Sequence, residues 1–124
     1  MGKYTFRKEE RLRKEKLIKE LFEKGSSINL YPLKVIYSLN TTESDHHQAL
    51  FTAPSRQFKR AVDRNKIKRR AREAYRIKKS TLLESPKLLL GFIYIAKKIE
   101  DYASIEKAVE KAIHKLNAVF LQNK

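Results

Sequence analysis

The stretch LLLGFIYIAK, residues 88–97, decides the fold of this chain. It is an almost unbroken apolar run whose length is typical of a β-strand. Such a run predicts a strand that is buried on both faces of its sheet, because a strand with one solvated face would alternate apolar and polar residues. The other elements are expected to pack around this strand.

A helix is predicted on each side of this strand. Residues 60–79 precede it and form the first of the two. After it, Ser104 can cap the second helix, and Glu106 lies in the first turn, where the helix dipole favours an acidic side chain. Apolar residues then recur at helical spacing and predict a stripe that faces the core, formed by Ile105, Ala108, Val109, Ala112, Ile113, Leu116 and Phe120.

Two more strands are predicted nearer the N-terminus. Residues 30–39 and 48–54 have the composition of strands, and the polar residues 40–47 between them indicate a turn. Pro32 lies at the start of the first strand, where a missing N–H group is tolerated. We therefore expect these two strands to pair as a hairpin.

Residues 9–24 predict an amphipathic first helix that ends at Gly25, because glycine accepts a positive φ after a helix at little cost. A short additional strand is expected near Ile28. The predicted order is αβββαβα, and the fold class is α+β: a two-layer α-β sandwich with a small mixed sheet and three helices. The length of 124 residues suits a single domain spanning residues 1–124.

The chain is strongly basic. It has 29 Lys and Arg residues against 14 Asp and Glu residues, which gives a formal net charge of +15. Such an excess indicates a polyanionic partner, with nucleic acid as the first candidate and an anionic membrane surface as the second. The chain has no cysteine, no apolar run of the roughly 20 residues that span a bilayer, and no signal peptide, so we expect a cytoplasmic protein.

The excess charge is concentrated between Arg56 and Lys79, where twelve basic residues face two acidic ones. On a helix, the residues of one side can dock on the sheet: Ile67, Ala71, Ala74 and Tyr75. The opposite side carries Asn65, Arg69, Arg72 and Arg76. A solvated helix usually mixes charges of both signs for i,i+4 pairing, and this helix does not, so a nucleic-acid contact is favoured over a merely solvated face. Charge alone does not separate RNA from DNA.

Other functions find less support in the sequence. A DNA-binding factor would show helix-turn-helix spacing, zinc ligands or heptads. A stand-alone nuclease needs clustered carboxylates, and the acidic residues here alternate with lysines. His46 and His47 are expected to point apart rather than bind a metal. A membrane-surface helix needs a large apolar face, which the basic helix lacks. A ribosomal-type RNA-binding protein without a role in tRNA processing stays open as the alternative.

The segment AVDRNKIKRRARE, residues 61–73, resembles the signature of the ribonuclease P protein family. The family pattern is an Arg-Asn-Arg triplet followed by Lys-Arg and Arg-Glu at set spacings. The matching residues are Arg64, Asn65, Lys68, Arg69, Arg72 and Glu73, and Lys66 replaces the third residue of the triplet. The first helix is similar too: Phe22 matches the second of two spaced phenylalanines, and Ile18 stands in place of the first.

The resemblance implies a fold, a partner and a set of contacts. It implies a left-handed β–α–β crossover that carries the basic helix, in an RNA-binding domain that helps a catalytic RNA to remove the 5′ leader of precursor tRNA. The resemblance also implies that the phosphodiester is hydrolysed with Mg²⁺ held mainly by the RNA subunit, and that the protein alone binds no cofactor and is inactive. Its partners are ribonuclease P RNA, as a 1:1 complex with a protein monomer, and precursor tRNA.

Two groups of residues are expected to contact RNA. The first group would bind the RNA: Arg56, Lys59, Arg60, Arg64, Asn65, Lys66, Lys68, Arg69, Arg72 and Arg76. Within this group, the phosphates are expected to be contacted by Arg64, Lys66, Lys68, Arg69 and Arg72. The second group would line a cleft for the single-stranded leader, between the first helix and the sheet: Ile18, Phe22, Tyr37 and Phe51. Core packing is the competing role for the three aromatic residues.

Overall fold

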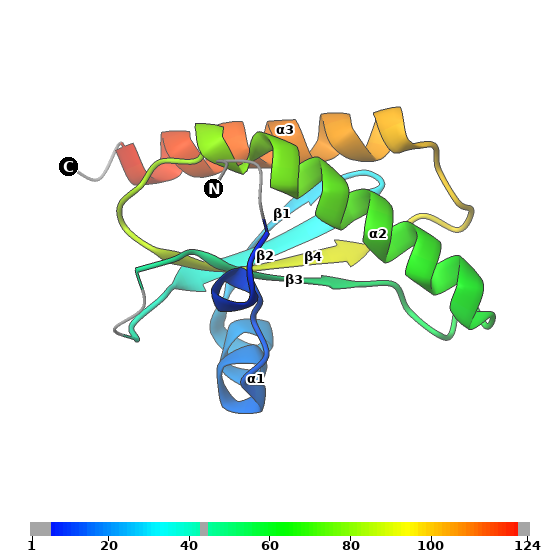
Figure 1. The fold of residues 1–124 in the computed structure, drawn as a ribbon, viewed down its shortest axis with the longest axis horizontal. Coiled ribbons are helices and arrows are strands. Elements are labelled where there is room, and N and C mark those ends of the chain that lie inside the picture. Colours follow the sequence, from blue (N-terminus) through cyan, green and yellow to red (C-terminus); the bar gives the residue numbers. More distant parts are fainter. Residues whose placement is uncertain (1–5, 43–44, 122–124) are drawn as a thin grey trace.

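A computed structural model describes residues 6–42 and 45–121 (Figure 1). The strands are β1 (Ser26–Leu30), β2 (Leu33–Leu39), β3 (Gln48–Thr52) and β4 (Leu88–Tyr94). The helices are α1 (Glu15–Lys24), α2 (Ala61–Lys78) and α3 (Tyr102–Leu121), with short 3₁₀ turns at Lys8–Glu10 and Lys79–Thr81. The α+β class, the αβββαβα order and the additional strand at Ile28 are confirmed. No helix in the described part of the chain is long and apolar enough to cross a membrane.

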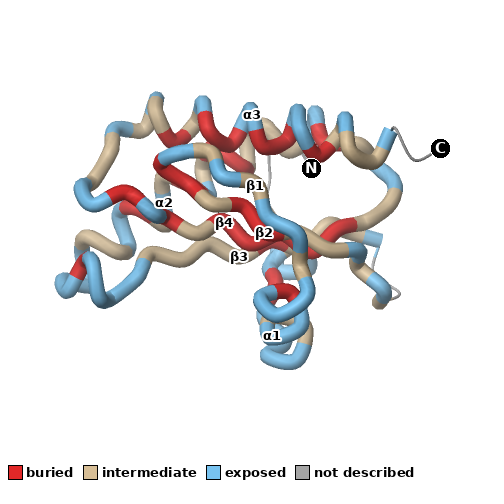
Figure 2. The backbone as a smooth tube through the Cα atoms, turned by 180° about the vertical axis from the view of Figure 1, so that it is seen from behind, coloured by how far each residue is buried: buried red, intermediate tan, exposed pale blue. Residues whose placement is uncertain are grey.

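The apolar run that decides the fold is an inner strand of the sheet. The strand order is β1-β2-β4-β3, so β4 has a partner on each side. Helices α2 and α3 cover one face of the sheet, and the shorter α1 lies on the other (Figure 1). Leu90 and Phe92 of β4 belong to the core under α2 and α3, whereas Leu89 belongs to a smaller cluster under α1. Burial of β4 on both faces is therefore confirmed, and Figure 2 shows the buried residues gathered between the layers.

The predicted hairpin between residues 30–39 and 48–54 is wrong. Strand β2 pairs with β1 on one side and with β4 on the other, both antiparallel. Among the described strands, β3 has β4 as its one neighbour and pairs with it in parallel. The reason is that β4, the most apolar strand, takes the inner position between β2 and β3, where both of its faces are covered. Helix α2 then provides the long crossover that two parallel strands require. The left-handed sense of this crossover stays a prediction.

The first helix begins at Glu15, six residues later than predicted. Arg11 instead forms a parallel bridge with Ala49 of β3, and the Leu12 N–H donates to the Ala49 carbonyl oxygen at 3.0 Å. The side chain of Leu12 is buried. Edge strand β3 has unpaired backbone groups, and pairing with them takes these residues out of the helix.

Two predicted helix caps are also corrected. Gly25 has a φ of −70°, so it is not needed for a positive φ. It is needed for space, because a Cβ atom there would lie 2.5 Å from the Leu21 carbonyl oxygen and 3.1 Å from that of Tyr37. Helix α3 starts two residues before Ser104, and the Ser104 N–H donates to Asp101 Oδ1 at 2.9 Å. Asp101 is therefore the cap, and this hydrogen bond lowers the pKa of its carboxyl group.

Candidate nucleic-acid interface

Helix α2 is positioned by a narrow docking face. Ile67, Ala71, Ala74 and Tyr75 are its buried residues, as predicted. Two of the four are alanines, so the helix axis can approach the sheet closely. Most of the remaining helix surface carries charged side chains, and the docking of α2 places a row of cations beside the edge strand β3.

The basic side chains of α2 divide into two classes. Some are bound within the protein: Arg64 Nη1 donates to the carbonyl oxygens of Phe58 at 2.7 Å and Lys59 at 2.8 Å, which braces the connection from β3 to α2. Arg70 Nη1 donates to the Glu100 carbonyl oxygen at 2.6 Å, tying α2 to the segment before α3. These arginines have a structural role besides any contact with RNA.

The C-terminal part of α2 is neutralised by acidic side chains. Arg76 Nη2 lies 2.5 Å from Glu73 Oε1, and this hydrogen bond lowers the pKa of the Glu73 carboxyl group. Lys78 Nζ lies 2.9 Å from Glu110 Oε2 of α3. Just beyond the helix, Lys79 pairs with Glu10 in a half-buried contact. Positive charge that is available to a partner is therefore concentrated nearer the helix N-terminus.

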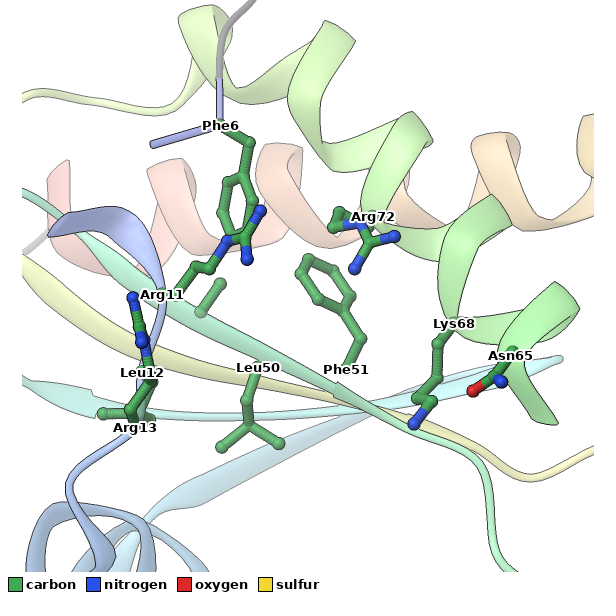
Figure 3. Close-up of a pocket in the computed structure, with 10 residues that line it drawn as sticks. Phe6, Arg11, Leu12, Arg13, Leu50, Phe51, Asn65, Lys68 and Arg72 are labelled. Carbon is green, nitrogen blue, oxygen red and sulfur yellow. The ribbon is translucent and has the colours of Figure 1, made fainter. Parts of the chain in front are cut away.

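The second class consists of Lys66, Lys68, Arg69 and Arg72. Within residues 6–42 and 45–121, none of the four forms an ion pair or a side-chain hydrogen bond. Lys68 and Arg72 lie one helical turn apart and point toward the same hollow, which is described next (Figure 3). Like charges at this spacing repel each other unless a polyanion lies between them.

This hollow is a groove of about 340 Å³ between α2 and the N-terminal segment. We call it the β3 groove, because Ala49, Leu50 and Phe51 of β3 form its floor. One wall is formed by α2, and the other by the segment that leads into α1 (Figure 3). The lining residues outside the floor are Phe6, Arg11, Leu12, Arg13, Asn65, Lys68 and Arg72.

The floor of the β3 groove rests on an aromatic cluster. The ring of Phe51 stacks on Phe92 of β4, with centroids 5.2 Å apart and planes 12° apart. Phe6 meets Phe51 edge-on at 5.8 Å, and the Arg11 guanidinium lies 5.6 Å from the Phe6 ring centroid. Phe51 therefore serves the core with one face and leaves only part of its ring to the groove. The position of Phe51 is therefore compatible with both roles considered for it, core packing and contact with RNA.

The chemistry of the β3 groove suits a phosphate backbone. Its described lining carries four cationic side chains, one amide and two aromatic rings, and no carboxylate. Cations around an apolar floor are the combination that binds single-stranded nucleic acid, with phosphates on the charges and bases on the rings. No group of three or more potential metal ligands occurs among the described residues.

The four residues predicted for the leader cleft do not line one cleft. Ile18 packs in the cluster under α1, and Phe22 of α1 is 48% exposed. Tyr37 points to the opposite sheet face, where its ring meets Phe120 of α3 at 5.9 Å. Phe51 lies in the β3 groove. The register of β2 explains this separation, because it turns Ile36, not Tyr37, toward α1. Binding of the leader by these residues stays a prediction.

The ten residues predicted for RNA contact are distributed along α2 and the loop before it. Asn65, Lys68 and Arg72 line the β3 groove, and Lys66 and Arg69 are exposed beside it. The remaining five are Arg56, Lys59 and Arg60 before the helix, and Arg64 and Arg76, whose internal contacts are given above. Sequence reasoning missed Phe6, Arg11 and Arg13. The only local sign of their role is an aromatic residue followed by arginines. The bridge between Arg11 and Ala49, which places these residues at the groove, joins segments far apart in the sequence.

His47 has a structural role. The Leu88 N–H donates to His47 Nδ1 at 3.0 Å, and Nε2 lies 2.8 Å from the Leu83 carbonyl oxygen. Because Nδ1 accepts, Nε2 carries the proton and donates, so the ring is held as the neutral tautomer. Burial lowers the pKa of this ring below its ordinary value. Both ring nitrogens of His47 are therefore occupied by backbone groups, and the expectation that His47 binds no metal stays a prediction.

Comparison with known proteins bears on this interface. The family model of ribonuclease P matches residues 6–117. The ribonuclease P protein component of Porphyromonas gingivalis is 33% identical over 115 residues, which cover 86% of this chain and 82% of the relative. That of Petrotoga mobilis is 34% identical over 121 residues, covering 92% and 97%. The solved RNase P protein of Staphylococcus aureus superposes with a TM-score of 0.72 at 26% identity, covering 90% and 97%.

Proposed function

Because the chain belongs to the ribonuclease P protein family, we propose that it is the protein subunit of a ribonuclease P. In this proposal it is a single RNA-binding domain that forms a 1:1 complex with ribonuclease P RNA in the cytoplasm. It assists the endonucleolytic removal of the 5′ leader from precursor tRNA. The structural observation that supports the proposal is the β3 groove, whose cationic wall contains three of the six residues that match the family signature.

The basic residues of α2 that line the β3 groove and those outside it are expected to bind different RNA segments. The side chains of Lys66 and Arg69 would bind phosphates of the RNA subunit, because they are exposed and do not line the β3 groove. Lys68 and Arg72 would bind phosphates of the single-stranded leader, with Phe6 and Phe51 offering ring edges to its bases. Contacts of this kind give affinity and position rather than sequence choice.

We place the chemical step on the RNA subunit. Cations, not carboxylates, line the β3 groove, so the groove suits the phosphates of RNA better than Mg²⁺. In the proposed holoenzyme, Mg²⁺ held by the RNA supplies the hydrolysis of the phosphodiester. The protein holds the leader and thereby keeps the substrate on the RNA, which matters most when Mg²⁺ is scarce.

Reconstitution tests the proposal. An in-vitro transcribed bacterial ribonuclease P RNA, a precursor tRNA with a 5′ leader, and the protein are mixed at low Mg²⁺, and leader release is followed with each component left out in turn. Cleavage should require the RNA and rise sharply when the protein is added. Protein that binds RNA tightly without changing cleavage would favour the alternative, a basic RNA-binding protein with no role in tRNA processing. Cleavage by the protein alone would refute a purely assisting role.

A further inference from the structure

A second basic hollow lies at the sheet edge opposite the β3 groove. Strand β1 forms this edge, and α3 packs over β1 and β2, whereas α2 packs over β3 (Figure 2). Two hollows of about 360 and 530 Å³ follow the line between β1 and α3, and Asn29 lines both. We call this line the β1 groove. Neither the family signature nor the β3 groove contributes a residue to it.

The charges of α3 are segregated toward this groove. Lys107, Lys111 and Lys115 recur every fourth residue, about 6 Å apart along the helix axis, and line the two hollows in turn. The acidic residues of the same turns have partners away from this groove: Glu110 pairs with Lys78 of α2 at 2.9 Å, and Glu106 accepts from the Tyr102 hydroxyl of its own helix at 3.1 Å. One carboxylate residue, Glu100, lines the far end of the first hollow.

An aromatic ring lies at the same end of the β1 groove. Tyr31, in the turn between β1 and β2, is 66% exposed, more than any other large apolar side chain that the structure describes as exposed. It contributes nothing to either core cluster. Asn29 and Ser27, with the free edge of β1, add hydrogen-bonding groups along the floor. A row of lysines that ends beside an exposed ring repeats the chemistry of single-strand binding sites.

We propose that the β1 groove is a second site for single-stranded RNA. Phosphates lie along Lys107, Lys111 and Lys115, and one base stacks on Tyr31. The occupant is RNA rather than an acidic peptide, because the exposed ring offers a stacking surface for a base while the lysines recur at close to the spacing of successive phosphates in an extended strand. The site is independent of α2, so the protein can hold two RNA segments on opposite edges of its sheet.

A tryptophan reporter tests this site directly. The chain has no tryptophan, so Tyr31→Trp gives a fluorescence signal from the β1 groove alone. A 12-nucleotide unstructured RNA is titrated into this variant at low salt, and its total binding is followed in parallel by anisotropy of a label on the RNA. We expect saturable quenching of the introduced indole that persists when Arg69 and Arg72 are changed to alanine. Each phosphate contact of a single strand contributes about 0.7 to the slope of log K against log salt.

Charge-matched variants complete the test. A triple variant in the reporter background carries Lys107→Gln, Lys111→Gln and Lys115→Gln. Its affinity for the RNA, measured by quenching, should fall at least tenfold, and the slope of log K against log salt should fall by about 2. A control triple variant removes the same charge from exposed positions of α1, through Lys16→Gln, Lys19→Gln and Lys24→Gln. It should change the RNA affinity measured by quenching less than threefold. Equal loss in both triple variants would overturn the site in favour of net charge. Anisotropy without quenching would overturn it and leave the proposed function standing, whereas no binding by either signal would overturn both.

Discussion

At the scale of single residues, basic side chains that look equivalent in the sequence do different work. The guanidinium groups of Arg64 and Arg70 donate hydrogen bonds to backbone carbonyl oxygens, and Lys78 is neutralised by Glu110. Arg72 has no such partner in the described part of the chain and points into the β3 groove. Affinity for RNA should therefore depend on which cation is removed, and not only on how many.

Arg72→Ala should weaken the binding of a leader-bearing precursor tRNA by roughly three- to tenfold and lower its salt slope by about 0.7 to 0.9, because one phosphate contact is lost. Lys78→Ala removes the same charge from the same helix. It should change binding little, since Glu110 already neutralises Lys78. Titrations at several salt concentrations measure both quantities. Equal losses for the two variants would mean that α2 acts only through its overall charge.

His47 should make stability depend on pH near neutrality. Burial lowers the pKa of the folded ring below the ordinary value of 6.5, so the unfolded chain binds a proton more readily. The associated stability is complete above pH 6.5 and is lost as the pH falls toward the folded pKa. Thermal unfolding at about pH 7.5 and 5.5 should show a lower Tm at the acidic value, and His47→Gln should reduce that difference. An unchanged difference in the variant would assign the effect to other groups.

At the scale of elements, the strongly patterned segments could be predicted from sequence. The stripe of α3 and the docking face of α2 reflect burial that is periodic along one helix, and the apolar run of β4 reflects burial that is continuous along one strand; all three are confirmed. The pairing of strands, in contrast, could not be predicted from patterns within one segment. Nothing within residues 40–54 signals that β4 inserts between β2 and β3, and nothing in Arg11–Leu12 signals a bridge to Ala49.

The same limit explains how far the candidate site could be predicted. The cationic wall of the β3 groove lies on one helix, so its spacing was visible in the sequence. The opposite wall comes from Phe6, Arg11 and Arg13, which only the bridge to β3 brings within reach. The aromatic residues were assigned to one cleft because register was unknown, and a strand's register decides which face each side chain occupies.

The contact of α1 with the sheet should depend on Gly91 of β4. A Cβ atom at this position would lie 2.8 Å from Ile36 Cγ1 and 3.5 Å from Leu21 Cδ2 of α1. Gly91→Ala should therefore destabilise the protein by about 1–3 kcal/mol in urea unfolding, as overpacking does.

A double-mutant cycle shows whether this contact is the cause. Ile36→Ala alone should cost about 2–5 kcal/mol, because it leaves a cavity. It also removes the Cγ1 atom that the new methyl group would meet, so the double variant should lose clearly less than the sum of the single losses. Strict additivity would show that the cost of Gly91→Ala arises elsewhere.

At the scale of the whole molecule, the fold carries a charge imbalance that a polyanionic partner can relieve. Of the net charge of +15, +10 lies between Arg56 and Lys79, and Lys68, Arg69 and Arg72 of α2 are near neighbours within this stretch. Like charges one turn apart cost up to about 0.5 kcal/mol per pair. The protein alone is therefore expected to be less stable than its packing permits, and RNA that binds only the folded state should stabilise it.

This imbalance predicts opposite effects of salt on folding and on binding. Raising the salt concentration shortens the Debye length to about 10 Å at 0.1 M, which screens the repulsion on α2. The Tm of the free protein should therefore rise by about 2–5 °C between low and moderate salt, while RNA affinity falls over the same range. Arg72→Gln should raise the Tm at low salt, flatten its salt dependence and weaken RNA binding together. If the Tm is insensitive to salt in both the unmodified protein and Arg72→Gln, repulsion among the cations of α2 does not destabilise the fold. RNA would then relieve no repulsion when it binds.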